Sequence, residues 1–359
     1  MFIIHVVGAR PNFMKAAPVI DALAKHDGVT QYLVHTGQHY DRNMSAVFFD
    51  ELGLPEPDIN LEVGSGSHAQ QTAEIMQRFE PIILDKQPDW LIVYGDVNST
   101  IATTLVATKM GIKVAHVEAG LRSNDRRMPE ELNRLVTDRL ADLLLSPSQD
   151  GDDNLLNEGV SADRIELVGN VMIDTLARLL PQAETHWPAL KTNLKLDKYG
   201  LVTLHRPSNV DGKESLSMIL ETLNEIGNDL PLLFPAHPRT RARINSFELG
   251  HLTKNIQFID PVGYLDIVAL QKNASVIITD SGGIQEESTY LGVPCLTVRE
   301  NTERPITITV GTNVLIGQDM QLLRDSVKEI LAGTFKNGRN PDLWDGHAGE
   351  RIAKLLVHS

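Results

Sequence analysis

The sequence alternates between two kinds of segment along almost its whole length. Short runs of apolar, often β-branched residues end in glycine or polar residues, and segments with helical apolar periodicity follow them. The run from Trp90 to Tyr94 is apolar throughout, which is typical of a parallel strand buried on both faces, and Val276 to Thr279 forms another such run up to its final threonine. The alternation predicts an α/β fold in which helices connect parallel strands.

Two domains are expected, because 359 residues exceed what a single core usually serves. The alternation restarts at Tyr199, after a segment from Pro181 to Lys198 that mixes prolines, charges and isolated apolar residues. We place the interdomain connection just before or within that segment. Residues 1–175 would form one doubly wound, Rossmann-like domain and residues 176–345 a second.

Charge and composition exclude several classes of function. A net charge of −14 argues against nucleic acid as a partner. No stretch approaches the roughly 18 apolar residues of a membrane span, and the segment from Met1 to Gly8 lacks the features of a signal peptide. We therefore expect a cytoplasmic protein. A single cysteine, Cys295, excludes an intrachain disulfide and a multi-cysteine metal site, and we expect it to be buried.

No metal or cofactor is expected either. No cluster of histidine and carboxylate residues has metal-ligand spacing. The turn after the first strand, which begins at Gly8, carries neither the dinucleotide fingerprint nor a Walker loop. The absent fingerprint counts against a nicotinamide enzyme.

The segment from Val114 to Arg134 predicts a strand, a polar loop and a helix that opens at Pro129. Glu118 would lie at the end of the strand, and Glu130 and Glu131 in the first turn of the helix, where open α/β sheets place their ligand crevice. Arginines at 122, 126 and 127 occupy the loop between them. The alternative interpretation is a solvated loop held by salt bridges.

Further polar residues follow other predicted strands. Asp96 comes after the strand from Trp90 to Tyr94, where it would serve either the crevice or the following helix as an N-cap. Gly8 leads into a helix that carries Arg10 and Lys15, an arrangement that suits a phosphate because helix N-termini present free amides.

The second half carries the stronger anion-binding signal. Asp280-Ser281-Gly282-Gly283 ends a strand and opens a helix, so that backbone amides can approach an anion; the alternative is simply a tight turn. His205 and Arg304 follow other strands of the same half. Acid/base groups in the first half and anion-binding groups in the second indicate an enzyme that acts on a phosphorylated sugar.

Eight motifs occur together in an order that is specific to one enzyme family. They are G-A-R-P-N-F-M-K from Gly8, T-G-Q-H-Y-D from Thr36, G-D-V-N-S-T from Gly95, H-V-E-A-G-L-R from His116, P-E-E-L-N-R from Pro129, L-H-R-P from Leu204, D-S-G-G-I-Q-E-E from Asp280 and T-E-R-P from Thr302. From Gly8 to about Gly317 the chain resembles the non-hydrolysing UDP-N-acetylglucosamine 2-epimerases. The resemblance implies the GT-B fold, with two domains facing a central cleft, a homodimer, and residues 346–359 forming a helix that packs back on the first domain.

The reaction implied is reversible inversion at C2 of the sugar, by elimination of UDP to a 2-acetamidoglucal and re-addition, which supplies surface-polysaccharide precursors. By resemblance, UDP is held mainly by the second domain, and no cofactor is needed. The positions that match catalytic residues are Asp96, Glu118, Glu130 and His205. Those that match diphosphate contacts are Arg10, Lys15, Ser281, Gly282, Gly283 and Arg304, and Glu287 matches the ribose-binding position.

Departures from the family pattern leave alternatives open. Gln38 and His39 match an allosteric site of the family, but Gln70 stands where an arginine is expected, so substrate activation does not follow. The exact UDP-2-acetamido sugar is also open. A GT-B glycosyltransferase, a hydrolysing epimerase and a catalytically silent sugar-nucleotide sensor are the competing interpretations, and the retained acid/base residues argue against the sensor.

Overall fold

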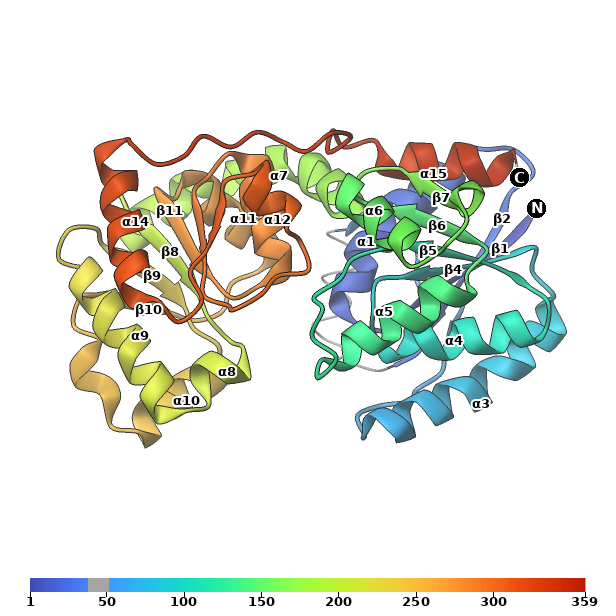
Figure 1. Cartoon of the computed structure of the whole chain (residues 1–359), viewed down its shortest axis with the longest axis horizontal. Helices are drawn as coiled ribbons and strands as arrows, with labels where there is room; N and C mark the ends of the chain where they lie inside the picture. The colour runs from blue at the N-terminus through green and yellow to red at the C-terminus, as the bar shows by residue number, and fades with distance from the viewer. Residues whose placement is uncertain (38–51, 359) are drawn as a thin grey trace. The chain divides into compact units, whose positions relative to one another are not determined.

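The computed structural model describes residues 1–37 and 52–358; the side chain of Arg10 is also outside the described part. The chain divides into two compact units. The first unit comprises Met1–Thr175 and Asp342–Ser359, and the second comprises Leu176–Pro341. Each unit consists of one sheet with helices on its faces, as Figure 1 shows.

The first unit contains a seven-stranded parallel sheet with the order β3-β2-β1-β4-β5-β6-β7. The strands are β1 Phe2–Val7, β2 Thr30–His35, β3 Ile59–Asn60, β4 Trp90–Tyr94, β5 Lys113–Val117, β6 Leu143–Ser146 and β7 Ile165–Leu167. The apolar runs predicted all of them except β3. This two-residue strand pairs with the end of β2.

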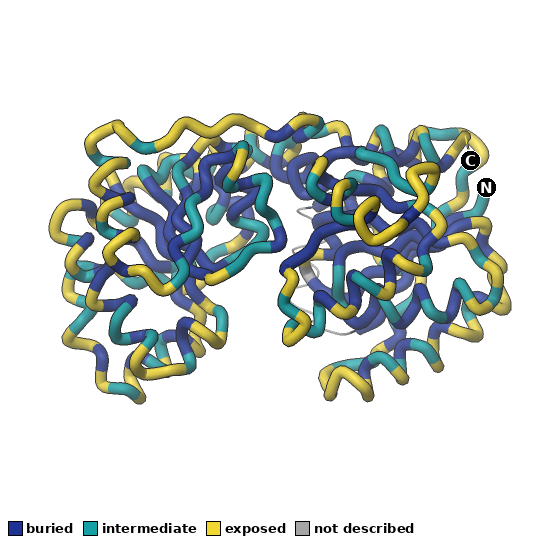
Figure 2. Tube along the Cα trace, viewed as in Figure 1, coloured by how far each residue is buried: buried dark blue, intermediate teal, exposed yellow. Residues whose placement is uncertain are grey.

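Helices cover both faces of this sheet. They are α1 Arg10–Leu23, α3 His68–Lys86, α4 Asn98–Lys109, α5 Pro129–Leu140, α6 Gln149–Asn157 and α15 Ala348–Val357, with a short 3-10 helix at Ala162–Arg164. α4 packs against both α3 and α5, whereas α1 packs against α15. The inner strands β1, β4, β5 and β6 are almost entirely buried, whereas the edge strands β3 and β7 are only partly covered (Figure 2).

The second unit contains a six-stranded parallel sheet with the order β10-β9-β8-β11-β12-β13. The strands are β8 Gly200–Thr203, β9 Leu232–Pro235, β10 Ile256–Ile259, β11 Val276–Thr279, β12 Cys295–Thr297 and β13 Asn313–Leu315. Its helices are α8 Pro207–Val210, α9 Lys213–Ile226, α10 Pro238–Ser246, α11 Tyr264–Asn273, α12 Gly282–Leu291, α13 Ile306–Thr309 and α14 Met320–Ala332, with a 3-10 helix at Leu249–Leu252. Cys295 is fully buried, as predicted.

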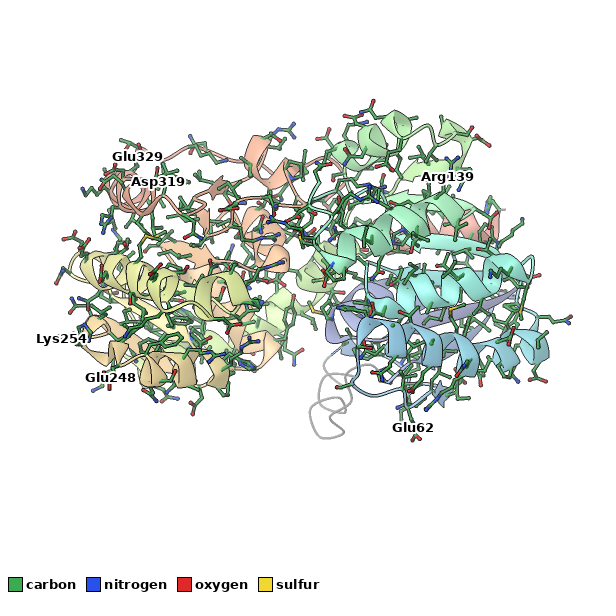
Figure 3. All side chains as sticks on the ribbon, turned by 60° about the horizontal axis from the view of Figure 1, so that its bottom comes forward. Glu62, Arg139, Glu248, Lys254, Asp319 and Glu329 are labelled. Atoms are coloured by element: carbon green, nitrogen blue, oxygen red, sulfur yellow. The ribbon has the colours of Figure 1, made fainter. Side chains whose placement is uncertain are left out.

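The chain passes between the units inside one long helix, α7 Val171–Leu194. The division falls after Thr175, ahead of the proline-containing segment, and both Pro181 and Pro188 lie within the helix. Charged side chains such as Glu62, Glu248 and Glu329 are exposed on the outer surfaces of the units (Figure 3). Among the described residues, no helix is long and apolar enough to cross a membrane.

The chain returns to the first unit through a closely fitted segment. The backbone of Leu343 approaches Gly169 so closely that a Cβ there would lie 2.2 Å from the Leu343 carbonyl oxygen. The Trp344 indole donates to the carbonyl of Pro147, 2.9 Å away. The buried carboxylate of Asp174 then accepts the first amides of α15, from Ala348 and Gly349. These contacts fix α15 against α1.

Candidate functional site

Each sheet has a switch point, where the strand order reverses and neighbouring strands lead to helices on opposite faces. The switch lies between β1 and β4 in the first unit and between β8 and β11 in the second. In sheets of this kind the ligand crevice opens at the carboxyl ends of those strands. Most of the residues that the sequence marks as catalytic or diphosphate-binding follow these strands or β5, and Arg304 follows β12.

Glu118, the residue after β5, is held in an unusual backbone conformation. Its φ is +74°, in the left-handed region that non-glycine residues seldom adopt. The side chain is buried, and its carboxylate forms an ion pair with the ammonium group of Lys15 from α1. Gly95 lies against this pair, since a Cβ there would be 2.6 Å from Lys15 Nζ and 3.0 Å from Glu118 Oε2. Backbone strain of this kind is concentrated at functional sites.

Asp96, the second residue after β4, does not cap α4, so the N-cap alternative is wrong. The N-cap residue of α4 is Val97. The carboxylate of Asp96 instead accepts two hydrogen bonds from Arg134 of α5, from Nε at 3.0 Å and Nη2 at 2.6 Å. Asn133, also on α5, donates to the Asp96 carbonyl oxygen. α5 therefore fixes the position of Asp96.

The two neighbouring glutamates of α5 have different surroundings. Glu131 is buried, pairs with Arg134 and accepts the backbone amides of Ser123 and Asn124, so it organises the loop before the helix. Glu130 is only partly buried, and among the described residues it has no hydrogen-bond or ion-pair partner. Glu130 is thus the carboxylate that is available to a ligand.

The basic loop between Glu118 and α5 combines the two interpretations that the sequence left open. Arg122 is buried and forms ion pairs with Asp138 and Glu158. Arg126 and Arg127 are exposed, and Arg127 pairs with Asp125 of the same loop. The alternative of a solvated loop is therefore correct for these last two arginines, and a salt bridge is present at Arg127.

In the second unit, Asp280 at the end of β11 is the anchor of the site. Its fully buried carboxylate accepts the backbone amides of His205 and Arg206 and the side-chain amide of Asn209. It also lies 3.0 Å from Nδ1 of His205. Burial would raise the pKa of Asp280, but His205 and these donors hold the pKa below its ordinary value. The His205 ring is consequently oriented at Nδ1 while its side chain remains 57% exposed.

The turn after Asp280 brings a guanidinium against backbone amides. α12 begins at Gly282, and a Cβ on Gly282 would lie 2.8 Å from Nη1 of Arg304. Arg304 is held by the buried Glu286, with Nε 2.8 Å from Oε1. The helix N-terminus and Arg304 together form a positively charged surface of the kind that binds phosphate.

Comparison with known proteins places the chain in a family. Residues 21–357 match the protein family described as UDP-N-acetylglucosamine 2-epimerase. The chain belongs to this family. It is 44% identical to the UDP-N-acetylglucosamine 2-epimerase of Methanocaldococcus jannaschii over 98% of each chain. It is 42% identical to the UDP-2,3-diacetamido-2,3-dideoxy-D-glucuronate 2-epimerase of Pseudomonas aeruginosa over 99% of each chain.

Solved structures of the UDP-N-acetylglucosamine 2-epimerase family have the same fold. The M. jannaschii UDP-GlcNAc 2-epimerase in complex with UDP-GlcNAc and UDP matches with a TM-score of 0.89, 43% identity and full coverage of both chains. The enzyme from Neisseria meningitidis bound to UDP-GlcNAc also matches with a TM-score of 0.89, at 31% identity. The predicted fold class and family are confirmed: the chain is a GT-B type α/β protein and an isomerase.

One basic residue beside the candidate site, Arg206, was not predicted from the sequence. Its Nε donates to the carbonyl of Asp280, and no carboxylate among the described residues forms an ion pair with it. Burial and the neighbouring charge of Arg299 lower its pKa. Arg299 itself is paired with Glu303. The available signal was the position of Arg206 directly after His205 at a strand end.

Glu287 of α12 is buried more deeply than its predicted role in ribose binding suggested. Tyr264 donates to Oε1 at 3.0 Å and Gln271 donates to Oε2 at 2.6 Å. Burial raises the pKa of Glu287 to about 7, despite these hydrogen bonds. Its ionisation is therefore balanced near neutrality.

The allosteric pair of the epimerase family, Gln38 and His39, lies outside the described residues. Gln70, which stands where the family has an arginine, forms a capping box with Ser67 at the start of α3. In the described ranges, no group of three or more histidine, cysteine or acidic residues could hold a metal ion.

Proposed function

We propose that this protein reversibly epimerises UDP-N-acetylglucosamine at C2, by eliminating UDP and adding it back to a 2-acetamidoglucal. The carboxylates that follow the strands of the first unit support this proposal best. Asp96, Glu118 and Glu130 are three acidic groups at one edge of the sheet, and a protein that only binds a nucleotide does not need them.

The second unit supplies the groups that would hold UDP. The amides from Ser281 to Gly283 and the guanidinium of Arg304 would bind the diphosphate. Arg206 adds a second guanidinium beside the same turn. Glu287 would accept hydrogen bonds from the ribose hydroxyls, with Tyr264 and Gln271 holding its carboxylate in place.

In the first step a base removes the proton from C2, the C2–H electrons form the C1=C2 double bond, and the C1–O bond breaks. UDP leaves with the electron pair of the C1–O bond, so its negative charge must be stabilised. We assign this to Arg206, Arg304 and the α12 amides, with His205 held by Asp280 as a proton donor or acceptor. UDP and a proton then add back, with the proton delivered to the other face of C2.

Carboxylates must therefore be able to exchange a proton with C2 of the sugar from either face. Glu130, which lacks a partner among the described residues, and Glu118, which is paired with Lys15, are the two bases that we propose. Lys15 and, by family resemblance, Arg10 would also approach the diphosphate. Asp96 is fixed by Arg134 at the end of the neighbouring strand β4.

The test is proton NMR of UDP-N-acetylglucosamine incubated with the protein in D2O. The proposal requires that UDP-N-acetylmannosamine appears and that both sugars gain deuterium at C2. Free N-acetylmannosamine with stoichiometric UDP would identify a hydrolysing enzyme. An unchanged spectrum in the presence of tight UDP binding would contradict the proposed substrate and leave a glycosyltransferase or another sugar.

A second candidate substrate is the diacetamido glucuronate sugar, because the P. aeruginosa relative named for it is nearly as similar to the chain as the archaeal enzyme. Equal concentrations of the two UDP-sugars in one D2O reaction would decide between them. The sugar that gains deuterium faster has the higher kcat/KM.

We also propose that the product feeds surface-polysaccharide synthesis and that the enzyme acts in the cytoplasm as a homodimer, as the family resemblance implies. Light scattering coupled to gel filtration tests the dimer directly. A mass equal to one chain of 39.7 kDa would exclude it.

A further inference from the structure

The fully buried His116, the last residue but one of β5, has an acceptor at each ring nitrogen. Nε2 lies 2.8 Å from the carbonyl oxygen of Gly95, and Nδ1 lies 2.6 Å from Oδ1 of Asp138 in α5. A carbonyl oxygen cannot donate, so Nε2 must carry a proton. The charge of the ring therefore depends on whether Nδ1 also carries one.

Asp138 has the surroundings of an ionised carboxylate. Oδ2 accepts the backbone amide of Gly120 and the guanidinium of Arg122, at 3.1 and 2.7 Å. Burial opposes the charge of Asp138, but the Arg122 guanidinium and the Gly120 amide both favour the ionised carboxylate, independently of His116. An ionised carboxylate only accepts hydrogen bonds, so Nδ1 of His116 must donate.

The charges around the ring also balance when His116 carries a proton on both nitrogens. His116 and Arg122 would contribute two positive charges, and Asp138 and Glu158 two negative ones. Arg122 donates to both carboxylates, through Nη1 to Asp138 and through Nε and Nη2 to Glu158. A neutral ring would leave two buried or half-buried carboxylates to one arginine.

We propose that His116 is an imidazolium, with a proton on each ring nitrogen, that together with Asp138 positions the loops carrying Asp96 and Glu118. One partner of His116 is the carbonyl of Gly95, directly before Asp96. The partner of Asp138 is the amide of Gly120, two residues after Glu118. The imidazolium thus joins the ends of β4 and β5. The assignment of Asp96 and Glu118 to the chemistry rests on the proposed function; the charge of the ring does not.

The position of Gly95 explains why this clamp, formed by His116 and Asp138 between the ends of β4 and β5, would matter for the reaction. Gly95 has a φ of +61° and fits directly against Lys15 and Glu118. A shift of its carbonyl would displace both the ion pair and the following Asp96. Misplacement of catalytic groups by about 1 Å can lower rates by about a hundredfold, so His116 would affect turnover without touching the substrate.

The chain contains an internal control for the charge of the ring. His5 of β1 is equally buried, but its nitrogens face the Tyr94 hydroxyl at 2.7 Å and the Gln31 side chain at 2.9 Å, with no carboxylate. Burial lowers the pKa of His5 to about 4. Two buried histidines of one sheet should therefore differ in charge.

The first experiment is ¹⁵N NMR of the full-length protein labelled at histidine, recorded between about pH 6 and 8, where free histidine titrates. His116, assigned by its loss in His116→Gln, should have two protonated nitrogens throughout, whereas His5 should have one. A single protonated nitrogen on His116 would overturn the proposal, because Asp138 would then share its proton with a neutral ring.

The second experiment tests positioning by C2 deuterium exchange kinetics. We expect His116→Gln and Asp138→Asn each to lower kcat by about ten- to hundredfold, with KM for the UDP-sugar within about threefold. The double variant can restore the hydrogen bonds without charges, because the introduced asparagine amide would donate to the introduced glutamine, and that glutamine would donate to the carbonyl of Gly95. It should recover at least about tenfold over the worse single variant.

His5→Gln is the matched control, since it alters an equally buried histidine outside this clamp. Its kcat should stay within about threefold of the wild-type value. His116 is merely structural if His116→Gln loses no more kcat than His5→Gln. The same conclusion follows if KM and kcat change in parallel with a loss of thermal stability and the double variant gives no recovery.

Discussion

At the scale of single residues, we expect two adjacent glutamates of α5 to have different roles: Glu130 in the reaction and Glu131 in the stability of the fold. Glu130→Gln removes a carboxylate that has no partner among the described residues. We expect it to lower kcat by at least about a hundredfold, as loss of a general base does, while Tm stays unchanged. Thermal unfolding and C2 deuterium exchange measure both effects.

Glu131→Gln is the matched control because it changes a carboxylate that already has three partners. It weakens the contacts to Arg134, Ser123 and Asn124, so we expect a loss of about 1–3 kcal/mol in the free energy of unfolding. If Glu130→Gln lowers Tm as much as Glu131→Gln, the two residues share a structural role.

The diphosphate assignment is tested by two arginines of the second unit. Arg304→Ala and Arg206→Ala should each weaken UDP binding by roughly 1.5–3 kcal/mol, because each would remove a charge-assisted hydrogen bond. Isothermal titration calorimetry with UDP measures the loss. Arg324→Ala, which breaks the surface pair with Glu225, should leave UDP affinity unchanged. Equal effects of all three variants would remove Arg206 and Arg304 from the site.

At the scale of helices and strands, the acceptor at the start of α15 predicts a pH dependence. Burial raises the pKa of Asp174 to about 6, although the amides of Gly349 and Ala348 oppose the shift. The folded state then binds the proton more tightly than the unfolded state. The contribution of Asp174 to stability is therefore greatest below about pH 4, its unfolded value, and is lost as pH rises through about 6.

The free energy of unfolding of the wild-type protein minus that of Asp174→Asn should fall by roughly 2–3 kcal/mol between pH 4 and 6. Urea unfolding at a series of pH values measures this difference, and asparagine removes the titration. A difference that does not change with pH would mean that Asp174 titrates as an ordinary carboxyl group.

Buried strands could be predicted from the sequence because a parallel strand covered on both faces is apolar at every position. Four largely apolar runs coincide with β4, β6, β9 and β11 from end to end, although β6 ends in Ser146 and β11 in Thr279. β3 escaped prediction because two residues, Ile59 and Asn60, carry no periodicity. The prolines of α7 suggested an irregular segment, although the surrounding residues continue the helix.

The positions of the site residues could be predicted, but their partners could not. Strand ends and glycine turns are local features, so Glu118, His205 and Asp280 were recognisable from the sequence. The contacts of Asp96 with Arg134 and of His116 with Asp138 join residues far apart in the chain. No local pattern encodes them, and for that reason Asp96 could be mistaken for a helix cap.

At the scale of the whole molecule, the three tryptophans report on the units separately. Trp90 and Trp344 are buried in the first unit, and Trp187 stacks on Tyr199 in the second. UDP at a hundredfold excess over its Kd should stabilise the unit that binds it by about 2.7 kcal/mol. On addition of UDP, we expect the unfolding midpoint measured with Trp187 to shift more than the unfolding midpoint measured with Trp90 and Trp344.

Variants that keep either Trp187 alone or the other two tryptophans allow each midpoint to be measured by fluorescence. Phenylalanine replaces the tryptophans that are removed. Shifts of equal size in both would show that the units unfold together or that UDP contacts them equally. A larger shift for the first unit would contradict the assignment of UDP to the second.

The return of the chain to the first unit determines the order in which a ribosome can complete the two units. Synthesis runs from the N-terminus, and domains usually fold as they emerge. The second unit ends at Pro341, whereas the first lacks Trp344 and α15 until the residues after Asp342 have been made. The unit that is begun first is finished last. A nascent chain stalled before α15 would display a finished second unit beside an uncovered face of α1, which chaperones and proteases can recognise.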